Sequence, residues 1–382
     1  MAYFLRKEYT YILCRRTEEN EDFLYRQGFI NIEIDKEWLL LDIRRPIVLF
    51  ADLMQSLKSP FTENDCVRKN VYKSRKKLQK VLTKLYPGNL VLMMDSTVIN
   101  HKLVEMITRE NRIEEIPAGQ KWGKKMCVPF GKILKGIQIP NTVTKELNTE
   151  KVYSSDMNHF IIREYPNYAE LETQLRTIKA FERPVIMVDN LFHKGYRMSF
   201  ISPYLEKEKV EVSKIIVSVL SGIGKDIAKK EKKNVECAYF IPNMRSWFIE
   251  SDFYPFIGGD SIEKEGKKTS MLPSVNPILP YQIPCFLEGI SSKALYELSE
   301  VCLENTQELL ETIENIYQEK MRRKLNMGRL GEVFFQSRYP DSGKESLDST
   351  NEIPSEYIKY ERERLKRMKY FIVYGTEGEG DG

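Results

Sequence analysis

Polar and basic side chains follow directly after a buried apolar segment between residues 185 and 197. Residues 185–188 are VIMV, a continuous apolar run that is typical of a strand covered on both faces. The residues after this run are Asp189, Asn190, Leu191, Phe192, His193, Lys194, Gly195, Tyr196 and Arg197. Ligands of an open parallel sheet bind beyond the carboxyl ends of its strands, so this loop is where chemistry is expected.

These residue types fit a phosphorylated sugar. The side-chain oxygens of Asp189 and Asn190 can accept hydrogen bonds from sugar hydroxyls. Gly195 permits a tight turn that brings main-chain amides to a phosphate, and a following helix adds partial positive charge at its N-terminus. Lys194 and Arg197 add full charges, and arginine can bind two phosphate oxygens at once. The predicted phosphate-binding residues are His193, Lys194, Gly195, Tyr196 and Arg197.

The segment resembles the signature of type I phosphoribosyltransferases. In that signature, four apolar residues precede two acids, two apolar residues and a phosphate loop rich in Thr and Gly. Here residues 185–188 are the apolar run, and Asp189 and Asn190 take the acid positions. Leu191 and Phe192 are the apolar pair.

The resemblance implies a ligand, a metal and a set of roles. Asp189 and Asn190 would bind the ribose of phosphoribosyl pyrophosphate, residues 193–197 would bind its 5-phosphate, and Mg²⁺ would accompany the pyrophosphate. The sequence departs from the family at Asn190, where an amide replaces the second acid. The loop also lacks the family's Thr residues and second glycine, and has Tyr196 and Arg197 in their place.

Two further segments match the family by their order in the chain. An earlier strand of the family ends in a loop that contacts the pyrophosphate, and Asp95, Ser96 and Thr97 occupy that place; the alternative is a plain helix N-cap. A flexible loop that closes over the reaction would correspond to the Gly- and Lys-rich residues 119–136; the alternative is an ordinary surface hairpin. The candidate residues of this loop are Lys124, Lys125 and Lys132.

The elements that must position these residues are strands alternating with helices. Apolar runs at 90–95, 185–189, 214–220 and 235–241 are separated by helical segments, which predicts an α/β fold with a central parallel sheet of phosphoribosyltransferase-like type. An α+β N-terminal region and a helical C-terminal region would flank it. The expected divisions are an N-terminal region at 1–87, the phosphoribosyltransferase-like domain at 88–260, a Pro/Gly-rich connector at 261–290, a helical region at 291–374 and a disordered acidic tail at 375–382.

The N-terminal region contains the most basic segment of the chain, a predicted helix at 66–86. Basic residues line it without any acid, while its apolar residues recur at helical spacing. Either it contacts nucleic acid or an acidic partner, or its charges balance acids elsewhere in the fold; the second is favoured. Thr62 and Asp65 predict a capping box at its start, and residues 47–57 after Pro46 predict another helix.

The bulk composition excludes several classes of function. The net charge of +4 gives no global argument for binding nucleic acid or an anionic membrane. The six cysteines are scattered without a CxxC pair and there are three histidines, so we expect reduced thiols and no metal site made by side chains. The sequence shows no signal peptide and no apolar run of about 20 residues, which predicts a cytoplasmic protein without a membrane partner.

Two classes of function remain open, and both concern nucleotide metabolism. One is an enzyme that transfers a phosphoribosyl group to an acceptor, for which the sequence assigns neither a catalytic residue nor a general base. The other is a non-catalytic protein that senses a nucleotide or phosphoribosyl ligand, which the altered loop permits. Both bind a phosphorylated small molecule; nucleic-acid binding through the helix at 66–86 is a weaker third alternative.

Overall fold

The computed structural model describes residues 10–32, 35, 37–111, 122–166, 168–263, 273–281, 289–340 and 351–373. The chain forms two compact units. The first unit consists of Met1–Met94, Arg245–Lys267 and Met271–Gly382, and the second of Asp95–Met244 and Lys268–Ser270. Both units combine helices with sheets, in agreement with the predicted α/β class. None of the described helices is both long enough and apolar enough to cross a membrane.

A parallel sheet with the strand order β11-β10-β9-β5-β6 forms the centre of the second unit. Its strands are β5 (Met126–Pro129), β6 (Val143–Thr144), β9 (Val185–Phe192), β10 (Val212–Ser221) and β11 (Val235–Ile241). β9 lies between β10 and β5, and its first four residues are fully buried. The apolar run at 185–188 is therefore an interior strand, as predicted from its composition.

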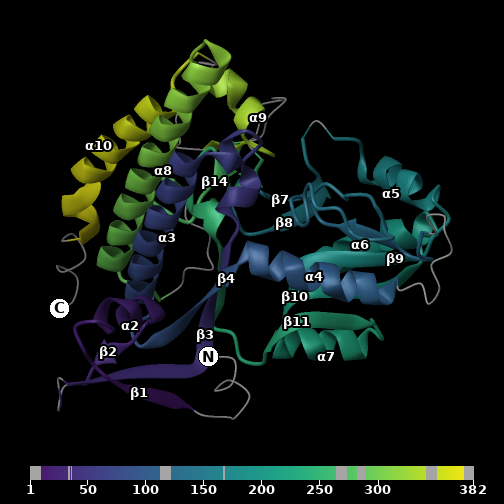
Figure 1. The fold of residues 1–382 in the computed structure, drawn as a ribbon, viewed down its shortest axis with the longest axis horizontal. Coiled ribbons are helices and arrows are strands. Elements are labelled where there is room, and N and C mark those ends of the chain that lie inside the picture. Colours follow the sequence, from purple (N-terminus) through teal and green to yellow (C-terminus); the bar gives the residue numbers. More distant parts are fainter. Residues whose placement is uncertain are drawn as a thin grey trace. The chain divides into compact units, whose positions relative to one another are not determined.

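Four helices and a hairpin surround this sheet. The helices are α4 (Ser96–Glu110), α5 (Leu171–Lys179), α6 (Tyr196–Lys207) and α7 (Gly222–Lys230), and the hairpin pairs β7 (Thr149–Tyr153) with β8 (Phe160–Glu164). α4 and α7 both pack against β10 and β11, and Figure 1 shows these strands side by side between the two helices. Each crossover from β9 to β10 and from β10 to β11 contains one helix, because parallel neighbours require a long return connection.

The first unit has a sheet built around one long strand, β3 (Trp38–Ala51). β1 (Tyr11–Arg15), β2 (Ile30–Asn31), β4 (Asn89–Asp95) and β12 (Ser246–Ile249) all pair with it, and α2 (Glu21–Gln27) lies between β1 and β2 in the chain. β4 was expected to begin the parallel sheet that contains residues 185–188. The structure instead pairs β4 with β3, in the other unit.

Three helices of the first unit run side by side: α3 (Asp65–Leu85), α8 (Ser292–Met321) and α10 (Pro354–Val373) (Figure 1). Their apolar faces bury a large core that includes Leu78, Leu82, Leu309 and Ile313. The shorter elements of this unit are the 3₁₀ helices at Leu53–Ser56, Phe61–Glu63, Glu250–Phe253 and Met327–Arg329, α9 (Leu330–Val333), and β13 (Asp260–Ile262), β14 (Pro273–Val275) and β15 (Tyr339–Pro340).

Two local predictions in the first unit are wrong. The helix expected at 47–57 is the second half of β3, since residues 47–50 pair with β12, and only a 3₁₀ turn follows. The helix cap expected at Thr62 is Asn64, whose side-chain oxygen accepts the Cys66 N–H at 2.9 Å. The acidic tail at 375–382 lies outside the described residues, as does much of the Pro/Gly-rich connector.

Candidate functional site

The structure continues β9 through Phe192, so Asp189 and Asn190, predicted in a loop after residue 188, lie within the strand because they pair with β10. The rest of the predicted ligand loop leaves the carboxyl end of β9 and enters α6 through Gly195. Gly195 has a φ of 69°, a left-handed conformation that glycine adopts without steric cost. The carbonyl of Gly195 accepts the Ser199 N–H at 2.9 Å. The amides of the first helical turn have no partner within the helix, so they are available to an anion.

Asp189, in the last half of β9, is ion-paired with Arg197, in the first turn of α6. Its Oδ1 accepts the Arg197 Nη1–H at 2.6 Å and the Asn190 main-chain N–H at 2.7 Å. The Asp189 side chain is 13% exposed and that of Arg197 is 35% exposed. Burial raises the pKa of Asp189, and the charge of Arg197 opposes that rise. The carboxylate expected to hold ribose hydroxyls therefore has one oxygen, Oδ1, already bonded to an arginine and a main-chain amide.

Arg197 also contacts the residue that follows β5. Its guanidinium carbon lies 5.0 Å from the centre of the Phe130 ring. The ring on one side and the Asp189 carboxylate on the other restrict the side chain, while about a third of it remains exposed to solvent. Arg197 is therefore a positioned cation at the carboxyl edge of the sheet.

His193 joins the ligand loop to the next strand of the sheet. Its Nδ1 lies 2.7 Å from the hydroxyl oxygen of Ser221, the last residue of β10. The same oxygen accepts the Gly224 N–H at 3.0 Å and caps α7. Burial, and secondarily Lys194, lowers the pKa of His193, which keeps the ring neutral near neutral pH. The contact with Ser221 positions His193 between the loop and β10.

Lys194, Tyr196 and Asn190 have different surroundings. The Lys194 ammonium lies 5.9 Å from the centre of the Tyr196 ring, and both residues are exposed. The Tyr196 ring packs edge-on against Phe160 of the β7–β8 hairpin, with 5.4 Å between centroids. The Asn190 Oδ1 lies 3.5 Å from the Ser218 hydroxyl, at the limit of a hydrogen bond.

Asp95, Ser96 and Thr97 form the N-terminus of α4. The Asp95 carboxylate accepts the Thr97 N–H at 2.9 Å, which is the geometry of a helix cap. The strand that precedes them, β4, does not neighbour β9, because β5 takes that place. In the structure these residues form a helix N-cap, the alternative given for them above.

The loop after β5 lies beside the ligand loop, and sequence reasoning missed it. The Phe130 N–H donates to the Val188 carbonyl at 3.0 Å, so Phe130, Gly131 and Lys132 follow β5 at the same edge where Asp189 follows residue 188. Lys132 was predicted as part of a closing loop, and the structure places it at this edge. The short apolar run MCVPF followed by Gly131 and Lys132 was the available signal.

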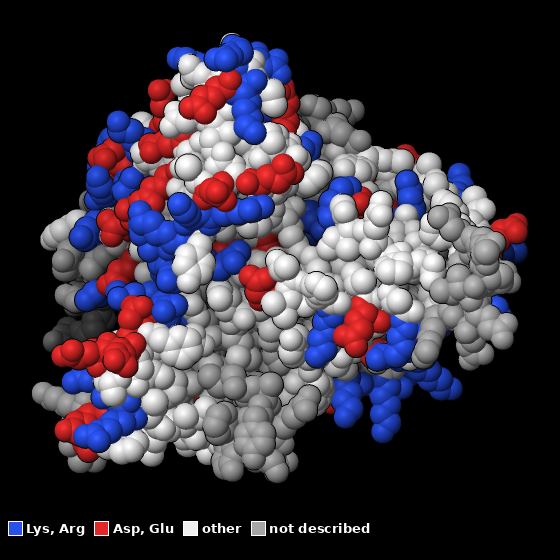
Figure 2. Space-filling view, in the orientation of Figure 1, with Lys and Arg blue, Asp and Glu red and all other residues white. Residues whose placement is uncertain are grey.

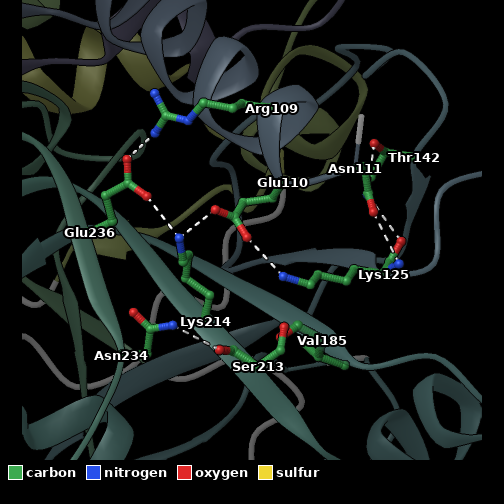
Figure 3. Close-up of polar contacts among 10 residues, drawn as sticks. All are labelled: Arg109, Glu110, Asn111, Lys125, Thr142, Val185, Ser213, Lys214, Asn234 and Glu236. Carbon is green, nitrogen blue, oxygen red and sulfur yellow. Dashed lines mark hydrogen bonds and ion pairs between the residues drawn. The ribbon is translucent and has the colours of Figure 1, made fainter. Parts of the chain in front are cut away.

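A connected set of ion pairs stands at the opposite, amino-terminal edge of the sheet (Figure 3). Lys214, near the start of β10, pairs with Glu110 and lies 3.0 Å from Glu236 of β11. Glu110 also pairs with Lys125 at 2.8 Å, and Arg109 pairs with Glu236. Burial opposes these charges, but the hydrogen bonds still lower the pKa of Glu110 and raise that of Lys214.

Lys125 is part of this network and not of a closing loop. Its main-chain N–H donates to Asn111 Oδ1 at 3.0 Å, and its carbonyl accepts from Asn111 Nδ2 at 3.1 Å. Lys124 precedes it directly, so both lysines lie at the amino edge, with the strand β5 between them and the ligand loop. We therefore leave both lysines out of the candidate site.

Replacing Lys214 by Met should lower the free energy of unfolding of the second unit by about 1–3 kcal/mol, because it leaves two partly buried carboxylates without their shared cation. Thermal unfolding of both variants measures this, with Lys230→Met as the control because Lys230 is exposed at the end of α7. Ligand affinity should not change, since the network is at the far edge of the sheet. Equal effects of the two variants would contradict a stabilising role for this network.

The basic residues of α3 are paired largely with acids of its own unit. Lys73 and Lys77 each lie 3.2 Å from Glu308 of α8, and Lys84 lies 2.6 Å from Glu297. Figure 2 shows Lys and Arg side chains intermixed with Asp and Glu over this helical bundle. Acids of α8 balance the charge of these three lysines, which agrees with the favoured alternative for this part of the helix.

No protein-family model matches the sequence, and no curated protein matches it. Among solved structures, adenine phosphoribosyltransferase from Thermoanaerobacter pseudethanolicus is similar over 43% of this chain and 99% of its own. The identity is 10% and the TM-score is 0.22. A similarity of that size does not assign a function, so the proposal below depends on the geometry of the loop.

Proposed function

We propose that the second unit binds a phosphorylated ribose, such as phosphoribosyl pyrophosphate or a related ribose phosphate, at the carboxyl edge of its parallel sheet. The observation that carries this is the loop after β9, where a left-handed glycine leads into α6 with Lys194 and Arg197 on either side. The phosphate would meet the first amides of α6 and these two cations. The ribose hydroxyls would meet Asp189 and Asn190.

Binding without transfer, as in a ligand sensor, is the form of this function that the site favours. Asn190 has no charge, and Asp189 is already paired with Arg197. A transferase must stabilise a cationic sugar and neutralise a leaving pyrophosphate, which requires carboxylates and cations free to act on the substrate. Here the Asp189 carboxylate already neutralises Arg197, which makes it less able to stabilise a cationic sugar, while the other N–H groups of the guanidinium can still bind a phosphate.

Calorimetric titration with ribose 5-phosphate and with phosphoribosyl pyrophosphate tests the binding. Lys194→Ala should lower the affinity for either ligand by about tenfold, because a charge-assisted hydrogen bond contributes about 1.5 kcal/mol or more. Asp189→Ala should also weaken binding, through the ribose. Lys230→Ala, which removes an exposed lysine from the far end of α7, should leave affinity unchanged.

Absence of binding of both ligands to the intact protein would refute the proposal. Equal losses from Lys194→Ala and Lys230→Ala would show attraction by general charge and no specific site. Release of pyrophosphate from phosphoribosyl pyrophosphate with a panel of bases would assign the transferase. Binding without release would assign the sensor.

A further inference from the structure

The likeness to phosphoribosyltransferases implies Mg²⁺, and the side chains at the carboxyl edge can be tested for a fit to that ion. Mg²⁺ takes oxygen ligands in a near-octahedral arrangement, commonly one or two protein carboxylates together with phosphate oxygens and water. At this edge lie the last residues of β5, β9 and β10 and the segments that follow them, residues 129–132, 189–197 and 221–225. Asp189 is the sole carboxylate in these three segments. Glu146, which follows β6 at the same edge, is paired with Lys135.

That carboxylate is already matched by a cation. Arg197 Nη1 lies 2.6 Å from Asp189 Oδ1, and the same oxygen accepts the Asn190 N–H. A metal on Asp189 would face the fixed positive charge of the guanidinium at close range in a partly buried site, where repulsion is poorly screened. The neighbouring position offers a neutral amide, Asn190. The donor set does not fit Mg²⁺.

The same residues do fit a phosphate without a metal. The hydrogen bond to Asp189 uses one N–H of the Arg197 guanidinium, which carries several more, and the side chain is 35% exposed. Lys194 adds a second, exposed cation on the other side of Gly195. Arginine binds phosphate oxygens in pairs, so the remaining N–H groups of Arg197 and the Lys194 ammonium can hold a phosphate by side-chain hydrogen bonds without a metal.

We propose that the ribose phosphate binds without Mg²⁺, with Arg197 as the cation that takes the place of the metal. This inference rests on the proposed ribose-phosphate function. It specifies the ligand as a phosphomonoester of ribose, such as ribose 5-phosphate or a nucleoside 5′-monophosphate. A pyrophosphate that requires a bound metal is excluded from this class. Arg197 is not part of the phosphoribosyltransferase signature, and in this proposal it makes the site specific for a phosphomonoester.

Titration of the intact protein with ribose 5-phosphate, in Mg²⁺ and again in a chelator, is the first experiment. The two affinities should agree within about twofold. Arg197→Ala should weaken binding by about tenfold or more in both buffers, and Arg197→Lys should recover part of the loss because it keeps the charge but not the paired contact. Lys230→Ala serves as the control for general charge.

The possible outcomes distinguish a failure of the metal-free site from a failure of the proposed ribose-phosphate binding. Binding that appears only with Mg²⁺, or that Mg²⁺ strengthens tenfold, overturns the metal-free site and leaves the ribose-phosphate function standing. An unchanged affinity in Arg197→Ala overturns the role of Arg197. Absence of binding in either buffer overturns both. The comparison of buffers needs no variant, so it stands even if Arg197→Ala fails to fold.

Discussion

Replacing Arg75 by Met is expected to lower the free energy of unfolding of the first unit by about 3–5 kcal/mol. Arg75 contacts both oxygens of Glu250, at 2.8 and 2.9 Å, and the Glu250 side chain is 0% exposed. The Leu53 N–H also donates to Glu250, at 3.1 Å. Burial raises the pKa of Glu250, and Arg75 opposes that rise by favouring the charged form. Without the arginine, a buried carboxylate must stay unpaired or take up a proton.

Lys73→Met is the matched control for Arg75→Met. Lys73 lies on the same helix and pairs with Glu308, but its side chain is 62% exposed. An exposed ion pair contributes about 0–1 kcal/mol, so this variant should be close to wild type in urea unfolding. Arg75→Met combined with Glu250→Gln should regain part of the lost stability, because the orphaned charge is gone. If Arg75→Met and Lys73→Met lowered the free energy of unfolding equally, burial would not explain how much the Arg75–Glu250 ion pair stabilises the unit.

Gly224→Ala is expected to destabilise the second unit by about 3 kcal/mol or more and to abolish ligand binding. A Cβ at Gly224 would lie 2.1 Å from the carbonyl oxygen of Phe192 and 3.2 Å from that of His193. Both obstacles are main-chain atoms at the end of β9, so no side-chain rotation can relieve the clash. The helix α7 would have to move away from the loop that carries His193 and Lys194.

Gly331→Ala supplies the reference for this substitution. Gly331 lies in α9, and a Cβ there meets nothing within 4 Å. Alanine has the higher helix propensity, so stability should stay level or rise by up to about 1 kcal/mol. Thermal unfolding and ribose 5-phosphate titration of both variants are the measurements. A Gly224→Ala protein with wild-type stability and affinity would contradict the close approach of α7 to β9.

The sequence was sufficient to predict the interior strand and the crossovers around it. Residues 185–188 are apolar without alternation, and strands β10 and β11 follow with one helix before each. Those signals are local. The order of β9, β10 and β11 then follows from the short right-handed connections that parallel strands need.

The errors arose where distant residues decide the structure. Residues 47–50 were expected in a helix, but they pair with β12, which is about 200 residues further along the chain. β5 was missed because it is only four residues long and ends in proline, so its neighbours β9 and β6 define it. The candidate residues of the ligand loop were named from their types, and their role stays a prediction. The contact of Arg197 with Asp189 depends on how α6 begins, which the sequence pattern does not contain.

The Ser221 hydroxyl has a consequence for how the second unit moves. One oxygen atom both caps α7, through the Gly224 N–H, and contacts the His193 ring in the ligand loop. Neither segment can leave its place without disturbing a contact of the other. We therefore expect the segment at His193 and the first turn of α7 to open together in amide hydrogen exchange.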